Sequence, residues 1–164
     1  MSDKVLIHHA FPPVYDRHSI ALILGSFPSV KSRRISFYYG NRQNRFWKML
    51  YGYFGESLTE DVEERKSFLL KRGVALWDLV ESCEIEGSMD AAIRNYTLVD
   101  LEAVLRVAPL KAILLNGSKA YELFLEKYAD CKVPYRKLPS TSPANTRYDE
   151  GEWRKALDGV FGIS

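Results

Sequence analysis

Short apolar runs alternate with segments of helical spacing along most of this chain. Four runs have the character of strands in a covered sheet: residues 19–24, 74–77, 111–115 and 133–138. Five segments place apolar residues at helical spacing: residues 45–53, 57–72, 100–108, 118–128 and 150–161. The order strand, helix, helix, strand, helix, strand, helix, strand, helix is typical of α/β proteins. It predicts a three-layer α/β/α sandwich with a short, mainly parallel four-stranded sheet.

Local signals set several boundaries of these elements. Ser57 and Glu60 have the spacing of a capping box, which predicts that the second helix begins there. Gly73 follows the same helix and is a favoured stop at a helix C-terminus. The opening residues 1–14 are interpreted as an extended arm that leads to the first strand.

The size and composition of the chain are those of an ordinary globular domain. Its 164 residues are enough to bury a core, and we expect one domain spanning residues 1–164. The formal net charge of +2 permits binding of nucleic acid without arguing for it. The sequence has no signal-peptide pattern and no apolar run of about 18 residues, so we expect a cytoplasmic protein without a membrane partner. We also expect a monomer.

The cysteines and histidines do not form a metal-binding pattern. Cys83 and Cys131 are far apart and belong to no Cys-x-x-Cys or Cys/His spacing. His8, His9 and His18 are not spaced as a metal triad. We therefore expect no metal site.

Small or polar residues follow each predicted strand. They are Gly25-Ser26, Asp78, Asn116-Gly117 and Ser140-Thr141-Ser142. The carboxyl ends of parallel strands meet at one rim of a sheet, where α/β proteins bind ligands. Aromatic residues near the first of these segments are suited to stacking on a flat ring. The sequence therefore predicts a pocket for a base or nucleotide at this rim, with Asp78 assigned to capping or orienting a neighbouring loop.

Positive charge gathers around the first of these segments. No acidic residue interrupts the set Lys31, Arg33, Arg34, Arg42, Arg45 and Lys48. Such a run is typical either of a solvated face or of a surface that binds nucleic acid. The sequence leaves both interpretations open.

Three motifs, taken together and in this order, resemble the uracil-DNA glycosylase superfamily. Residues 25–29 read Gly-Ser-Phe-Pro-Ser, residues 44–48 read Asn-Arg-Phe-Trp-Lys, and residues 138–145 read Leu-Pro-Ser-Thr-Ser-Pro-Ala-Asn. The second motif is similar to the mismatch-specific uracil-DNA glycosylases. The first and third motifs, with Phe-Tyr-Tyr at 37–39, are similar to the hypoxanthine-DNA glycosylase branch. With the match at 117–121, the likeness covers about residues 20–147.

The resemblance implies a monofunctional DNA glycosylase of base excision repair, with no metal or organic cofactor. Such an enzyme extrudes a deaminated nucleotide from DNA into a pocket and hydrolyses its N-glycosidic bond. The transition state resembles an oxocarbenium ion, so the protein stabilises the departing base and places a water behind C1′. The expected base is hypoxanthine, with uracil as a second candidate. A mismatch-specific uracil or thymine glycosylase is the alternative within the family.

The resemblance also assigns residues to the base pocket. Gly25, Ser26 and Phe27 are expected to line it with backbone groups. Tyr39 is expected to stack on the flipped base, and Asn116 to contact the base edge through its amide, which offers both a donor and an acceptor. The alternatives are that Tyr39 is a core aromatic residue and that Asn116 caps a helix.

The same resemblance assigns residues to DNA binding and to catalysis. Phosphate contacts are expected from Ser29, Arg45, Ser140, Thr141 and Arg147. Catalysis is assigned to Asn44, as the residue that positions water, and to Ser142. The alternative for Asn44 is capping of the helix that begins at Arg45.

The chain departs from the family pattern at two places. Phe27 stands where many branches carry an Asp or Asn that activates water, and a phenyl ring cannot do so. Ala144 and Asn145 are small residues that would fill poorly the space left by a flipped base. These departures keep open a protein that binds damaged DNA without cleaving it, and more distantly a domain that binds small nucleotides but not DNA.

Overall fold

The centre of the fold is a four-stranded parallel sheet. The computed structural model describes residues 4–8, 12–27, 37–86 and 93–162. The strands of the central sheet are β2 (Ala21–Gly25), β3 (Val74–Asp78), β6 (Ala112–Asn116) and β7 (Tyr135–Leu138). In the order β3-β2-β6-β7, each strand is parallel to its neighbours. The predicted sheet is confirmed.

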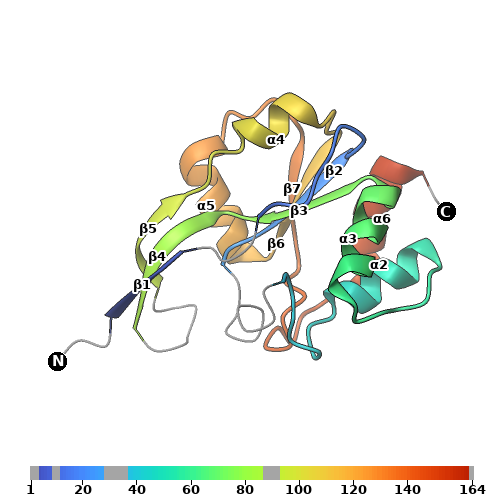
Figure 1. Ribbon diagram of the computed structural model, residues 1–164, viewed down its shortest axis with the longest axis horizontal. Coiled ribbons are helices and arrows are strands. Elements are labelled where there is room, and N and C mark those ends of the chain that lie inside the picture. The colour runs from blue at the N-terminus through green and yellow to red at the C-terminus, as the bar shows by residue number, and fades with distance from the viewer. Residues whose placement is uncertain (1–3, 9–11, 28–36, 87–92, 163–164) are drawn as a thin grey trace.

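Helices cover both faces of this sheet and make the three predicted layers (Figure 1). The helices on one face are α2 (Phe46–Phe54), α3 (Val62–Arg72) and α6 (Glu150–Phe161), and those on the other are α4 (Glu102–Val107) and α5 (Ser118–Tyr128). Successive side chains of a strand point to opposite faces. Accordingly Ile23 packs with the first group of helices, whereas Leu22 and Leu24 pack with the second. This double burial explains why β2 is apolar throughout.

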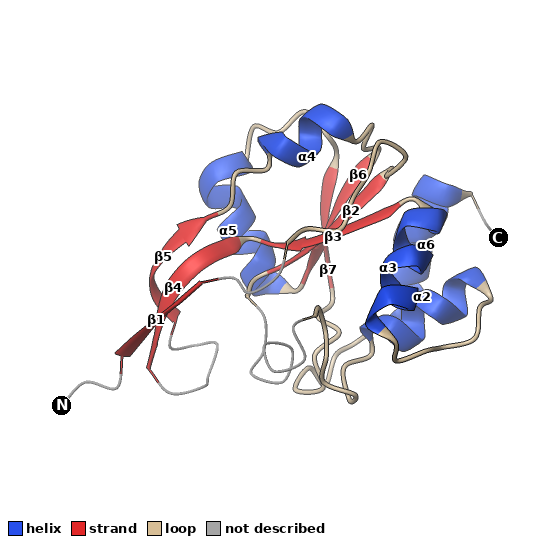
Figure 2. Cartoon of the chain, viewed as in Figure 1, coloured by secondary structure: helices blue, strands red, loops and turns tan. Residues whose placement is uncertain are grey.

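A second, antiparallel sheet was not predicted from the sequence. It consists of β1 (Lys4–His8), β4 (Val80–Glu86) and β5 (Ile93–Leu98) in the order β1-β4-β5. Figure 2 shows it extending to one side of the central sheet. Residues 4–8 of the expected arm therefore form a strand paired with β4. The sequence of β4, Val-Glu-Ser-Cys-Glu-Ile-Glu, has too few apolar residues to mark a strand by hydrophobicity.

The start of α3 differs from the prediction, and its end agrees. The predicted capping box of Ser57 and Glu60 is wrong, because the N-cap is Asp61. The Asp61 carboxylate accepts a hydrogen bond of 2.9 Å from the backbone N–H of Glu64. This places two acids in the first turn, where the helix dipole favours negative charge. Gly73 ends the helix with a φ of 76°, as predicted.

Among the described residues, no helix is both long enough and apolar enough to cross a membrane.

Candidate active site

The carboxyl ends of the four parallel strands meet at one rim of the sheet. Gly25 lies opposite Asp78 in the register of β2 and β3, and Asn116 lies opposite Leu138 in that of β6 and β7. The loop that precedes α2 and the loop that follows β7 lie side by side below this rim (Figure 2). The backbone N–H of Arg45 donates to the carbonyl of Thr141 at 3.0 Å and joins the two loops. The rim therefore combines the three motifs found in the sequence.

Two tryptophan side chains fix these loops to the helices. The indole N–H of Trp47 in α2 donates to the carbonyl of Tyr38 at 2.9 Å. The indole N–H of Trp153 in α6 donates to the carbonyl of Pro139 at 2.7 Å. Both rings are buried, so each provides a rigid anchor for a loop that carries candidate site residues.

Gly25 is required where the end of β2 meets the end of β3. A Cβ at this position would lie 2.5 Å from the Oδ1 atom of Asp78 and 3.0 Å from the hydroxyl oxygen of Tyr39. The first distance is too short for any side chain to be tolerated without movement. Gly25 therefore leaves the space in which a carboxylate and a phenol from two other segments come together.

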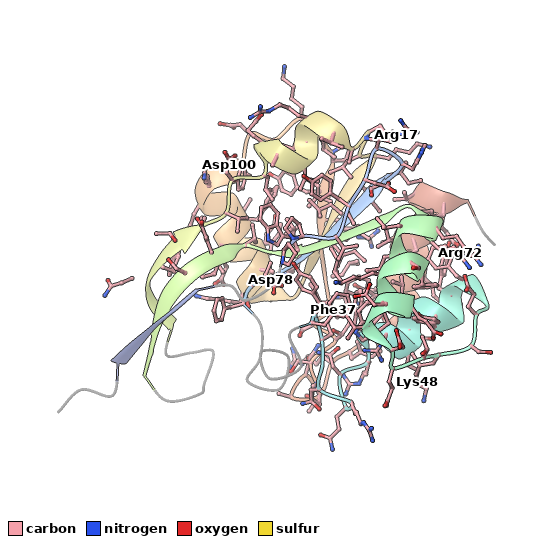
Figure 3. The ribbon with its side chains drawn as sticks, in the orientation of Figure 1. Arg17, Phe37, Lys48, Arg72, Asp78 and Asp100 are labelled. Atoms are coloured by element: carbon pink, nitrogen blue, oxygen red, sulfur yellow. The ribbon has the colours of Figure 1, made fainter. Side chains whose placement is uncertain are left out.

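Asp78 is a site residue that the sequence interpretation set aside. Its side chain is only 4% exposed, and Figure 3 shows it at the end of β3 near the middle of the molecule. Its place at a strand end, like that of Gly25 and Asn116, was the available signal. The sequence could not show that its carboxylate reaches the backbone of the neighbouring strand.

Tyr39 is held in a constrained conformation with its hydroxyl inside the protein. Its φ is 52°, a left-handed value that is uncommon for a residue other than glycine. Its ring stacks on Phe46 with centroids 4.2 Å apart, so Phe46 covers one face of the ring. The Tyr39 hydroxyl is buried and has no hydrogen-bond partner among the described residues.

The surroundings of Tyr39 keep its hydroxyl protonated. Burial raises the pKa of Tyr39 far above its ordinary value, and the negative charge of Asp78 raises it further. The amide of Asn116 lies close enough to act in the opposite direction, with a smaller effect on this pKa. Tyr39 thus brings to the site an O–H that can donate a hydrogen bond at any physiological pH.

The amide of Asn116 is oriented by Thr141. The backbone N–H of Thr141 donates to Oδ1 of Asn116, and Nδ2 of Asn116 donates to the Thr141 hydroxyl, both at 3.0 Å. Since only the oxygen can accept from a backbone N–H, the orientation of the amide is fixed. One N–H of Asn116 is left to donate elsewhere. Thr141 is fully buried, so we assign its side chain to positioning Asn116 rather than to a phosphate.

Gly117 allows the 140–142 segment to approach β6. Its φ is 98°, and a Cβ on it would lie 3.0 Å from the Cβ of Ser140. Its N–H donates to the carbonyl of Leu138 at 2.9 Å. A side chain at this position would therefore push the serine-rich loop away from Asn116.

The serine-rich loop, residues 139–147, is folded by its own side chains. The Ser140 hydroxyl accepts from the N–H of Ser142, and the Ser142 hydroxyl accepts from the N–H of Ala144. The Asn145 amide donates to the carbonyl of Ser140 and accepts from the N–H of Arg147. In these contacts the hydroxyls of Ser140 and Ser142 are acceptors, so their O–H groups stay available to donate to a ligand.

Arg45 holds this loop from the side of α2. Its guanidinium donates to the carbonyls of Ser142 at 3.2 Å and Asn145 at 3.0 Å. The same group lies over the ring of Tyr148, 4.8 Å from its centroid. Arg45 was predicted to contact phosphate. Because its guanidinium already donates to two carbonyls, we assign Arg45 mainly to holding the serine-rich loop in its conformation.

Asn44 combines a structural contact with a place on an open groove. Its Oδ1 accepts a hydrogen bond of 2.9 Å from the N–H of Phe46, although the N-cap of α2 is Arg45. Asn44 also lines a groove of about 490 Å³ together with Tyr39 and Lys48. The capping alternative and the functional role are therefore compatible, since the contact to Phe46 uses only the carbonyl oxygen of the amide.

Phe27 and Ser26 lie at the base of the predicted turn. Phe27 is 6% exposed and packs in the apolar cluster on the α4 and α5 side of the sheet. The carbonyl of Ser26 accepts from the N–H of Val80, which fixes the backbone at this point. Ser29 and the cationic residues at 31–34 lie outside the described residues.

A second groove runs along the serine-rich loop. It has a volume of about 590 Å³ and is lined by Ser118, Lys137, Ser140, Ser142, Arg147 and Glu152, among others. Lys137 and Arg147 are exposed cations, and the two serines supply hydroxyl donors. This groove has the chemistry of a surface that binds phosphates. Among the described residues, no group of three or more His, Cys, Asp or Glu side chains could hold a metal ion.

Comparison with known proteins identifies the family of this site. The model of a family described as the uracil DNA glycosylase superfamily matches residues 12–158. A protein of Methanosarcina acetivorans named hypoxanthine DNA glycosylase is 38% identical over 156 residues, covering 90% of this chain and 96% of the relative. A protein of the same name from Methanosarcina barkeri is 36% identical over 142 residues, covering 84% and 87%.

A solved structure of a related protein supports the same family assignment. The solution NMR structure of a Methanosarcina acetivorans protein assigned to the uracil DNA glycosylases has a TM-score of 0.80 and 33% sequence identity. The similarity covers 94% of this chain and 98% of that protein. The match therefore extends over nearly the entire chain, including the rim at which the three motifs meet.

Proposed function

The chain belongs to the uracil DNA glycosylase superfamily and is a DNA glycosylase, and from this premise we propose that hypoxanthine in DNA is its substrate. The observation that carries the proposal is the similarity to two proteins named hypoxanthine DNA glycosylase, at 38% and 36% identity over most of the chain. Uracil is a second candidate, because the family is described by that base.

The reaction begins when the damaged nucleotide leaves the duplex and enters the rim of the sheet. Extrusion costs a few kcal/mol and is easiest for a mispaired base, which is itself a source of selectivity. Ser140, Ser142 and Arg147 are assigned to the phosphates on either side of the flipped nucleotide. Such contacts fix the register of the DNA and carry no sequence information.

Cleavage then separates the base from deoxyribose. The Asn44 amide is proposed to orient the water that attacks C1′, and Ser142 to hold the sugar-phosphate in line with it. A neutral amide is a weak base, so most of the rate comes from stabilising the departing base. The second N–H of Asn116, whose amide is oriented by Thr141, can donate to a carbonyl oxygen on which negative charge develops.

Three further expectations accompany this proposal. Residues 1–164 act as one glycosylase domain, the protein works as a monomer on DNA, and it acts in the cytoplasm without metal or organic cofactor. The pair of loops joined by Arg45 and Thr141 supports a site built within a single chain.

One observation favours a different function. Phe27 is buried in an apolar cluster and cannot orient a water. An apolar residue at this position is what we would expect in a protein that binds damaged DNA without cutting it. A folded protein that retains damaged DNA and yields no abasic site would establish that function.

The substrate can be determined with a panel of labelled oligonucleotides. Single-turnover incubation is done on duplex and single-stranded DNA that carries hypoxanthine, uracil, xanthine or no lesion, and alkali then cleaves at abasic sites. Excision at hypoxanthine well above excision at uracil supports the proposal. Preference for uracil or thymine opposite guanine would instead establish a mismatch-specific enzyme.

Replacing Arg147 with alanine is expected to weaken binding to all DNA without changing stability. The side chain of Arg147 is exposed on the second groove, and only its backbone N–H is bonded within the loop. Loss of one phosphate contact lowers the slope of log K against log salt by about 0.9. Affinity is measured between 50 and 200 mM salt, a range in which counterion release is large.

The matched control for this variant is Arg17→Ala. Arg17 is also exposed, but it precedes β2 and lies at the other end of the strands from Asp78 (Figure 3). Its replacement should leave both affinity and salt slope unchanged. Equal losses in the two variants would show that Arg147 contributes only general charge.

A further inference from the structure

The carboxylate of Asp78 has no part in the reaction described so far. It is 4% exposed and lies at the end of β3, beside the position where Gly25 lacks a side chain. Its Oδ1 and the Tyr39 hydroxyl oxygen both lie within 3.0 Å of the point where a Cβ of Gly25 would be. The three strand-end and loop residues Gly25, Asp78 and Tyr39 thus form one small polar corner at the rim of the sheet.

The Tyr39 hydroxyl in this corner forms no hydrogen bond with the described part of the protein. Tyr39 is buried and unpartnered among the described residues, so it makes no hydrogen bond to Asp78 despite their closeness. An unpaired buried hydroxyl costs about 1–3 kcal/mol unless a ligand or water completes it. The left-handed φ of Tyr39 adds strain that persists only where surrounding structure imposes it. Both features indicate a corner arranged to receive a polar ligand.

Deamination changes the hydrogen-bonding edge of a base in a defined way. In adenine the ring nitrogen next to the amino group accepts a hydrogen bond. In hypoxanthine the same nitrogen carries hydrogen and donates, and the amino group has become a carbonyl. A carboxylate accepts but never donates, so it favours the deaminated edge and opposes the lone pair of adenine.

We propose that Asp78 recognises deaminated bases by accepting a hydrogen bond from the lactam N–H, while the Tyr39 hydroxyl donates to the adjacent carbonyl. This inference rests on the proposed excision of hypoxanthine and names the residues that select it. The selected class is a base with a ring N–H beside a carbonyl, which includes hypoxanthine, xanthine and uracil. Guanine and thymine have the same edge, so Asp78 separates a deaminated base from its parent adenine or cytosine and does not separate it from guanine or thymine.

The other polar groups of the site agree with this division of roles. The carbonyl oxygen of Asn116 already accepts from Thr141, so the Asn116 amide presents a donor and Asp78 supplies the acceptor. A carboxylate has about four acceptor sites, so Asp78 can keep contacts within the protein and still accept from a base. The raised pKa of Tyr39 keeps its hydroxyl a donor.

The arrangement also has an electrostatic cost. A negative carboxylate opposes the departure of an anionic base, and the Tyr39 and Asn116 donors at the same edge offset that effect. Asp78 is therefore a determinant of specificity, and its removal should change the ratio of rates between bases more than a structural residue would.

The experiment pairs variants of Asp78 with bases altered at one atom. Single-turnover rates are measured on duplexes that carry hypoxanthine or 1-methylhypoxanthine, in which a methyl group replaces the lactam hydrogen. The unaltered protein should prefer hypoxanthine by about 100-fold, the range of a lost hydrogen bond to a charged group. In Asp78→Ala, which removes the acceptor and makes room for the methyl group, the preference should fall to within a few-fold.

A second variant keeps the test valid if the alanine variant does not fold. Asp78→Asn has the same shape and can donate to the bare ring nitrogen of adenine. Its ratio of adenine to hypoxanthine excision should rise about tenfold or more over that of the unaltered protein. Tyr39→Phe, which removes only the hydroxyl, should lower excision of hypoxanthine about tenfold without changing the preference at the lactam nitrogen.

The outcomes separate this inference from the proposed function. If the unaltered protein excises hypoxanthine and Asp78→Asn leaves its ratio unchanged, the inference is wrong and the proposed function stands. An equal loss of excision rate on hypoxanthine and 1-methylhypoxanthine in Asp78→Ala would likewise assign Asp78 a structural role. If the unaltered protein excises no lactam base from any DNA, the proposed function itself fails.

Discussion

Replacing Asn44 with alanine is expected to lower the single-turnover rate of base excision by about 100-fold, with little change in the affinity for damaged DNA. Proton transfer by a positioned side chain contributes about 10²- to 10⁴-fold, and a neutral amide, as a weak base that mainly orients the water, belongs at the lower end. Asn44 lines the open groove beside Tyr39, and Phe27 cannot replace it. The rate is measured with enzyme in excess over a hypoxanthine-containing duplex.

The structural contact of Asn44 must be separated from this effect. Its Oδ1 accepts from the N–H of Phe46, and losing that bond costs about 1 kcal/mol of stability. Asn44→Asp retains the acceptor and so keeps this contact, and it serves as the control for folding. Thermal unfolding of both variants measures how much stability is lost with the hydrogen bond to Phe46. Turnover close to normal in folded Asn44→Ala would refute the assignment.

Replacing Gly25 with alanine is expected to reduce excision by about 100-fold or more in a protein that still folds. The new methyl group would lie 2.5 Å from Oδ1 of Asp78 and 3.0 Å from the Tyr39 hydroxyl oxygen. Either the carboxylate or the strand must move, and displacements of about 1 Å in a site can cost 10²-fold in rate. Overpacking also lowers the free energy of unfolding by about 1–3 kcal/mol.

Gly159→Ala is the matched control. Gly159 lies in α6, and a Cβ there would meet nothing within 4 Å. Alanine in a helix is more stable than glycine by about 1 kcal/mol, so this variant should be slightly more stable and equally active. If Gly25→Ala retains the rate of Gly159→Ala, the corner formed by Gly25, Asp78 and Tyr39 is not part of the site.

The central sheet was predictable because its strands are buried on both faces. Uniform burial produces continuous apolar runs, and β2 is the clearest of them. The antiparallel sheet was missed because neither β4 nor β5 has a continuous apolar run. The other partner of β4 is β1, which lies far earlier in the chain, so no local pattern indicated their pairing. The start of α3 was misplaced by a cap signal at Ser57 that competed with Asp61.

The location of the candidate site could be predicted from the sequence, but the roles of most of its side chains could not. Its location follows from the rule that strand ends share one rim, and the structure brings Gly25, Tyr39 and Asn116 together there. The contacts that define roles join residues far apart in the chain. Arg45 reaches Ser142 and Asn145, and Asp78 reaches Gly25, through geometry that no local pattern encodes.

The most direct test of the account measures the two products of hydrolysis on one substrate. A duplex with a single hypoxanthine is incubated with excess protein, the released base is identified by mass, and the strand is analysed with and without alkali. We expect free hypoxanthine in an amount equal to the alkali-sensitive sites, with the strand intact before alkali. Retention of the duplex by folded protein with no released base would contradict it.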